Sequence, residues 1–225
     1  MSLLYDLKAL GTKHGVETIQ DMQRDYSPYL VHLTSYSFNK GVRDALKAQL
    51  QPVEIADGMD MADKLSFDVF HQIVESGELM CSSPRKEEGM TECVCLSECT
   101  LSGVLGHSER YGRFGFVFEK RTIFGLGGRP CIYVDAGAYS YIDPNSDTDD
   151  RLKKMFGLAN VYRPSGFGQV QDFTHEREWR VFRSVPIDAA VAIVCPSKDY
   201  YAQVREQVKK EIPILPLDML YRWCV

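Results

Sequence analysis

The sequence predicts a single α+β domain over residues 1–225, with a mixed, mostly antiparallel sheet flanked by helices. Its 225 residues are an ordinary length for one domain. Hydrophobic residues make up 44% of the chain and charged residues 25%, the composition of a globular protein that buries a sizeable core. Segments with strand-like alternation are interspersed with segments of helical spacing, and no repeat or low-complexity tract separates them.

Hydrophobic periodicity places the first elements in order. Leucines at helical spacing before Gly11, and a second helical stretch after it, predict an N-terminal helical cap over residues 1–26. Residues 29–36 alternate between two faces and are rich in β-forming types, so we expect a strand there. Residues 61–75 carry apolar side chains along one side, and Gly77 provides a C-terminal stop, which predicts an amphipathic helix.

The rest of the chain supplies most of the predicted sheet. The acidic stretch at residues 143–147 has the composition of a surface loop. The final part, residues 186–225, is expected to form a strand, a helix of about 14 residues and a short extended piece that pack together. Further strands are predicted at residues 92–97, 112–119, 130–134, 176–182 and 191–195.

Charge and cysteine content narrow the functional classes. The formal net charge of −5 provides no global attraction to phosphate backbones, although a local basic groove stays open as an alternative. Seven cysteines, an odd number, without a preceding signal peptide argue against a secreted disulfide framework. No apolar stretch approaches the roughly 20 residues of a membrane-spanning helix. We therefore expect a cytoplasmic protein that does not bind membranes.

Two rows of polar side chains mark candidate sites on the predicted strands. His32 and Thr34 lie two residues apart, so both project from one face, where they could hold one polar ligand or simply form a solvent face. Glu176, Glu178 and Arg180 share a face in the same way. That second row fits a structural ion-pair ladder, and it also fits a carboxylate that stabilises a cationic sugar centre.

The region around Ser97 allows a further pair of interpretations. Ser97 and Thr100 precede a predicted helix and are suitable caps, but the same helix start could bind a diphosphate. Cys93, Cys95 and Cys99 follow a C-x-C-x3-C spacing that misses the paired C-x2-C of structural zinc sites, so we predict no metal. Burial as small hydrophobic residues is the simpler interpretation of these thiols.

Residues 92–135 contain short motifs in a fixed order, which include Cys95-Leu96-Ser97-Glu98, Arg110-Tyr111-Gly112 and Arg129-Pro130-Cys131-Ile132-Tyr133. This order resembles the abortive phage-infection family AbiGi. Its members run from a Cys-Phe-Ser/Cys-Asp/Glu strand through His-x3-Tyr-Gly to Pro-Val-x-Tyr. Together with an early His-x-Thr, the resemblance spans residues from about 30 to 181. The matching pieces are His32-Leu33-Thr34, Cys95-Leu96-Ser97-Glu98, His107, Arg110-Tyr111-Gly112, Arg129-Pro130-Cys131-Ile132-Tyr133 and Glu178-Trp179-Arg180.

The order of an early His-x-Thr, a middle tyrosine and a late Glu-x-Glu also resembles the ADP-ribosyltransferases, including toxins that modify nucleic acids. This resemblance implies an ADP-ribosyltransferase-like fold and NAD as substrate. It puts His32 and Thr34 against the nicotinamide-side ribose or amide, and Tyr111 near the nicotinamide ring. Glu178 would polarise the ribose and Glu176 would orient the acceptor. Ser97 and Arg180 complete the expected NAD-binding set, while Tyr111 departs from the pattern because it precedes a strand.

Two functions therefore compete. The first is a phage-defence or toxin–antitoxin protein that transfers ADP-ribose from NAD to a nucleic acid or protein acceptor. The alternative is a non-catalytic abortive-infection component, antitoxin-like, that binds a cognate partner protein; its Glu/Arg row is an ion-pair ladder and His32 is structural. A pure nucleic-acid-binding module is disfavoured by the acidic charge.

Overall fold

The computed structural model describes residues 27–34, 61–82, 92–135, 157–164, 170–171 and 176–224. The helical cap predicted over residues 1–26 and the loop predicted at residues 143–147 lie outside these ranges. Within them, helices and a mixed, mostly antiparallel sheet confirm the predicted α+β class.

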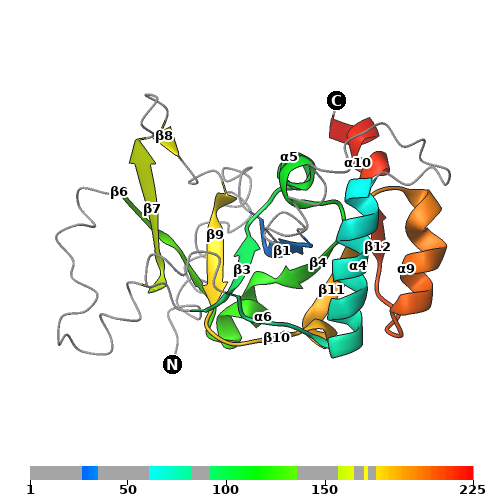
Figure 1. Ribbon diagram of the computed structural model, residues 1–225, viewed down its shortest axis with the longest axis horizontal. Helices are drawn as coiled ribbons and strands as arrows, with labels where there is room; N and C mark the ends of the chain where they lie inside the picture. The colour runs from blue at the N-terminus through cyan, green and yellow to red at the C-terminus, as the bar shows by residue number, and fades with distance from the viewer. Residues whose placement is uncertain are drawn as a thin grey trace, which may run out of the picture.

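A seven-stranded sheet forms the centre of the molecule (Figure 1). Its order is β12-β11-β4-β1-β3-β9-β5. Only β11 and β12 pair in parallel, and every other neighbouring pair in this sheet is antiparallel. The strands are β1 (Tyr29–Leu33), β3 (Val94–Ser97), β4 (Gly115–Glu119), β5 (Arg129–Pro130), β9 (Glu178–Val181), β11 (Ala190–Cys195) and β12 (Ile214–Pro216).

Two smaller sheets accompany it. Strands β6 (Ile132–Asp135), β7 (Ala159–Pro164) and β8 (Val170–Gln171) form a three-stranded sheet, and β2 (Glu78–Leu79) pairs with β10 (Val185–Pro186). In Figure 1 the three-stranded sheet lies beyond β9, at the end of the molecule away from α9 and α10. Because β6 directly follows β5, the chain passes from one sheet to the other at Cys131.

Local capping chemistry accounts for the start of α5 and the end of α4. The Thr100 side chain accepts a hydrogen bond from the Gly103 amide at 3.2 Å and so caps the start of α5. Gly77, at φ 77°, ends α4, as the sequence predicted. The helices are α4 (Met61–Ser76), α5 (Leu101–Tyr111), α6 (Lys120–Gly125), α9 (Tyr201–Gln207) and α10 (Leu217–Cys224), with 3-10 turns at Ile187–Ala189 and Lys198–Tyr200.

Strand alternation divides the core between the two faces of the main sheet. On the α4 face, Phe70 of the helix stacks on Phe116 of β4 with ring centroids 5.0 Å apart. On the opposite face, α5 and α10 cover a smaller cluster that includes Val31, Val117 and Leu217. Successive residues of a strand therefore project alternately towards the α4 face and towards the face covered by α5 and α10. This alternation decides which candidate site residues lie on the same face.

Several boundaries differ from the sequence prediction for identifiable reasons. The strand predicted at residues 112–119 begins at Gly115, because Gly112 instead ends α5. The strand predicted at residues 176–182 begins at Glu178, because Arg177 has a φ of 43° that interrupts an extended chain. In the C-terminal unit, α9 is half the predicted length, and α10 was not predicted. Among the described helices, none has both the length and the apolar character needed to span a bilayer.

Candidate functional site

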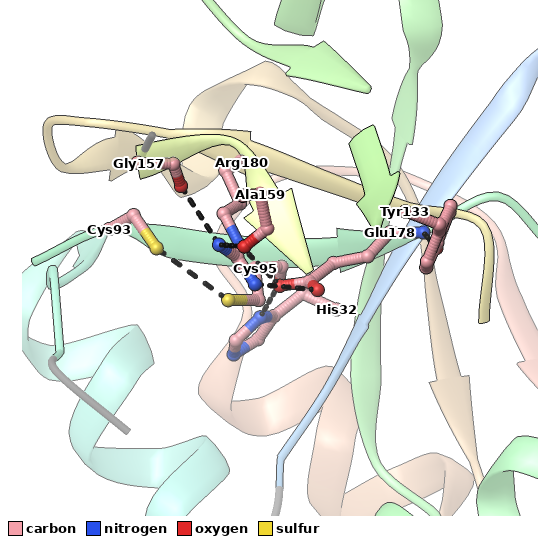
Figure 2. Close-up of polar contacts among 8 residues, drawn as sticks. All are labelled: His32, Cys93, Cys95, Tyr133, Gly157, Ala159, Glu178 and Arg180. Atoms are coloured by element: carbon pink, nitrogen blue, oxygen red, sulfur yellow. Dashed lines mark hydrogen bonds and ion pairs between the residues drawn. The ribbon is translucent and has the colours of Figure 1, made fainter. Parts of the chain in front are cut away.

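A buried ion pair on β9 occupies the predicted Glu/Arg row. Arg180 donates from Nε to Glu178 Oε1 at 2.9 Å and from Nη2 to Oε2 at 3.0 Å, a two-pronged contact (Figure 2). Glu178 is 8% exposed and Arg180 is 4% exposed. The two side chains share a face of the strand, as the sequence predicted.

This ion pair also joins the main sheet to the three-stranded sheet. The Arg180 Nη1 donates to the carbonyl oxygens of Gly157 at 2.8 Å and of Ala159 at 3.0 Å. The Glu178 amide donates to the Tyr133 hydroxyl at 2.7 Å, and its carbonyl accepts from the Cys131 amide at 2.8 Å. Both partners of the pair therefore hold β6 and β7 against β9.

Both oxygens of the Glu178 carboxylate accept hydrogen bonds from Arg180, so the carboxylate is held from within the protein. The nearby thiols of Cys95 and Cys131 also favour its charged form. Burial opposes the charged form, but the hydrogen bonds and charge of Arg180, with the two thiols, outweigh it, so the pKa of Glu178 lies below its ordinary value.

His32 and Thr34 lie on the other face of the sheet. The register pairs Val31 with Ser97 and His32 with Phe116, which turns His32 and Thr34 towards α4 and leaves Glu178 on the α5 side. The transferase resemblance puts both rows on one NAD molecule, whereas in this structure the two rows lie on opposite faces of the sheet. The alternation within each strand is as expected, but the pairing register turns the two rows in opposite directions.

Both residues of the His-x-Thr row have structural partners. Thr34 is fully buried, with its hydroxyl 3.0 Å from the Ser66 carbonyl oxygen and 3.1 Å from that of Phe114. The His32 ring donates from Nδ1 to the Cys95 carbonyl at 2.8 Å. Burial lowers the pKa of His32, and this hydrogen bond offsets the effect only in part.

Ser97, Tyr111 and Glu176 do lie with the β9 pair on the α5 side. Ser97 is the cross-strand neighbour of Glu178. Glu176 precedes β9 instead of belonging to it, because of the Arg177 backbone, and its carboxylate accepts a hydrogen bond from the Tyr111 hydroxyl. Burial first, and then the hydrogen bond and charge of Glu176, raise the pKa of Tyr111. This group, together with Tyr133, is called the β9 cluster below.

Three residues of this region were not predicted as site residues: Cys95, Cys131 and Tyr133. Cys131 follows the last β5 pair and stands beside Glu178, a position that only the strand register reveals. Cys93 and Cys95 share a face, with their sulfur atoms 3.7 Å apart, as their two-residue spacing allows. Over the described ranges, no three His, Cys, Asp or Glu side chains gather in the way that a metal ion requires.

Comparison with known proteins does not place the chain in a family. No family model, curated protein or solved structure matches it. The resemblances to AbiGi and to the ADP-ribosyltransferases therefore stay predictions made from short motifs.

A separate cavity opens at the end of the main sheet where β1 begins and β4 ends. Its volume is about 480 Å³, a size typical of small-ligand sites. Trp179 reaches it from β9, and because it alternates with Glu178 it projects from the opposite face of that strand. The cavity is lined by Pro28, Tyr29, Glu119, Lys120, Arg121, Phe124 and Trp179.

Proposed function

We propose that the chain is a non-catalytic, partner-binding component of a phage-defence or toxin–antitoxin system. The observation that supports this most directly is the Glu178 carboxylate, which is buried and has both oxygens bonded to the buried guanidinium of Arg180. The defence context rests on the resemblance to AbiGi. In this proposal the Glu/Arg row is a structural ion pair and His32 is a structural histidine.

The same geometry argues against Glu178 as the catalytic carboxylate of an NAD-dependent transferase. Such a carboxylate must direct a free acceptor position at the ribose. Here Glu178 is 8% exposed and both of its oxygens accept from Arg180, and a displaced Arg180 would be a buried, uncompensated charge. His32 and Thr34, which the transferase hypothesis places on the same NAD molecule, lie across the sheet.

A second candidate function is supported by the β9 cluster. A tyrosine hydroxyl and a half-buried carboxylate meet beside Glu178, and Ser97 faces the same side. This arrangement fits ADP-ribose transfer from NAD to a nucleic acid or protein acceptor, with Glu176 in place of Glu178 as the carboxylate nearest the ribose. NAD would be the co-substrate, and no metal is required.

Nicotinamide release from NAD distinguishes the two functions. Purified protein is incubated with NAD alone, and with RNA, DNA or cell lysate; we expect no release above a protein-free control. Release that Glu176→Gln or Tyr111→Phe abolishes, and that exposed Lys209→Gln leaves unchanged, would establish the transferase instead. Glu178→Gln is unsuitable for this test, because it breaks a buried ion pair and would lose activity through unfolding alone.

A further inference from the structure

The cavity beside Trp179 is built like the centre of a protein–protein interface. Of the seven described residues that line it, three are aromatic, and two of these are accessible: Tyr29 is 45% exposed and Phe124 is 44% exposed. Trp179 forms a more buried wall. Tryptophan, tyrosine, phenylalanine and arginine are the residues enriched where partners bind, with an aromatic centre inside a charged rim.

The charged residues at this cavity are already paired. Lys120 lies 2.7 Å from Glu98, and its ammonium also sits 5.7 Å from the centre of the Trp179 ring. Arg121 lies 2.6 Å from Glu119. Beside the cavity, the Arg129 guanidinium stacks over the Phe124 ring at 3.9 Å. Among the described residues that line the cavity, Lys120 and Arg121 are thus each paired with a carboxylate.

This pairing decides between two kinds of ligand. A nucleotide or nucleic acid needs cations for its phosphates, and the two cations among the described lining residues already have carboxylate partners. The net charge of −5 gives no further attraction for a polyanion. A protein surface that carries an aromatic side chain surrounded by charges of both signs complements the aromatic lining of the cavity. Its charges complement the ion-paired residues around the opening.

We propose that this cavity receives an aromatic side chain of a protein partner, as the anchor of the interface formed by the chain. The inference rests on the proposed partner-binding function and adds the place and chemistry of the contact. The incoming ring packs against Trp179 and Phe124 at the offset or edge-on geometries that aromatic pairs prefer. The Glu119–Arg121 pair at the rim remains in water and adds specificity more than affinity.

Backbone-amide NMR with small probes tests this directly. N-acetylphenylalanine amide is titrated into the full chain, with N-acetylalanine amide as the apolar control and adenosine and uridine monophosphates as nucleotide probes. We expect saturable shifts confined to Tyr29, residues 119–124 and the Trp179 indole with the phenylalanine probe only. Phe124→Ala should weaken that binding by about fivefold.

Tyr201→Ala is the matched control for Phe124→Ala. Tyr201 is also an aromatic residue with 44% exposure, and it too lies beside an arginine, Arg205, but it is on α9 and away from the cavity. Its replacement should leave probe binding unchanged. Unchanged amide shifts elsewhere in the Phe124→Ala spectrum show that the variant is folded.

Three results of the titration would overturn the proposal. Shifts caused by the monophosphates would make the cavity a nucleotide site, and absence of shifts with every probe would remove it as a binding site. Shifts that follow protein concentration alone would identify a second copy of the chain as the occupant. Nicotinamide release by the wild-type protein would contradict the non-catalytic function without affecting this test, so the two failures can be told apart.

Discussion

At the scale of single residues, Glu178 and Arg180 show how a charged pair can be stable inside a sheet. Burying either charge alone is costly, and the cost is compensated only when geometry and further hydrogen bonds are nearly complete. Here the guanidinium reaches both carboxylate oxygens and two backbone carbonyls. The side chains therefore depend on each other, and each single replacement leaves an unpaired buried charge.

Arg180→Met should lower the free energy of unfolding by roughly 3–5 kcal/mol, because Glu178 would remain charged without its partner. The double variant Glu178→Leu with Arg180→Met should recover part of this loss, although the carbonyls of Gly157 and Ala159 still lose a donor. Urea denaturation at neutral pH measures both. A loss below about 1 kcal/mol for the single variant would show that the pair is not structural.

His32 should make the protein less stable as the pH falls. Its pKa is lowered in the folded state from 6.5, so the unfolded chain binds the proton more readily. Its contribution is fully present above pH 6.5 and is lost as the pH falls from 6.5 towards the lowered value. His32→Gln can keep a donor to the Cys95 carbonyl without titrating.

Urea denaturation between about pH 5 and 8 compares the two proteins. Below pH 6.5, the free energy of unfolding should fall more steeply with decreasing pH in the wild type than in His32→Gln. Subtracting one curve from the other cancels the contribution of the other titrating groups. A wild type that gains stability relative to the variant on acidification would show that burial does not control His32.

At the scale of elements, Gly112 lets the end of α5 pass close to the end of β1. It has a φ of 111°, and an added Cβ would lie 2.3 Å from the Thr34 carbonyl oxygen and 2.8 Å from the Ser66 hydroxyl. The Ser66 hydroxyl in turn donates to that Thr34 carbonyl at 2.7 Å. Helix α4, strand β1 and the α5–β4 connection therefore meet at one glycine.

Gly112→Ala should lower the free energy of unfolding by about 3 kcal/mol or more, from backbone strain and overpacking together. Gly106→Ala is the matched control: it lies inside α5, where an added Cβ meets nothing within 4 Å. That change should stabilise the protein by roughly 0.5–1 kcal/mol through helix propensity. Thermal unfolding measures the change in stability of each variant relative to the wild type. Changes of the same sign in the two variants would contradict the prediction.

The elements show how far the sequence could predict the fold and the site. Alternation and glycine punctuation predicted β1, α4 and the placement of Glu178 and Arg180 on one face, because these depend on local chemistry. Pairing register is a long-range property. The register turns His32 away from Glu178 and places Cys131 next to Glu178. Because both relationships join segments that are far apart in the sequence, no local pattern could predict them. The Arg177 backbone, which detaches Glu176 from β9, likewise had no local signal.

At the scale of the whole molecule, the main sheet and the three-stranded sheet meet at a junction of covalent and polar links. The main sheet is held by packing on both faces, with α4 on one side and α5 and α10 on the other. The three-stranded sheet lies beyond its edge (Figure 1) and is joined through Cys131, Tyr133, Glu178 and Arg180. A buried ion pair therefore lies at the junction of these two sheets, where its hydrogen bonds hold one sheet against the other.

Arg180→Lys should loosen this junction while the main sheet stays intact. Lysine keeps the positive charge beside Glu178 but lacks the planar fork that also reaches Gly157 and Ala159. We expect the Cys131 and Ile132 amides, which donate to Glu178 and Leu158, to exchange hydrogen about tenfold faster, with β4 and β11 amides unchanged. Arg205→Lys, which removes an arginine contact to the Ile212 carbonyl on the far side of the molecule, is the control and should leave Cys131 and Ile132 unchanged. Uniformly faster exchange in Arg180→Lys would mean that the two sheets open as one unit, and unchanged exchange at Cys131 and Ile132 would mean that Arg180 does not join them.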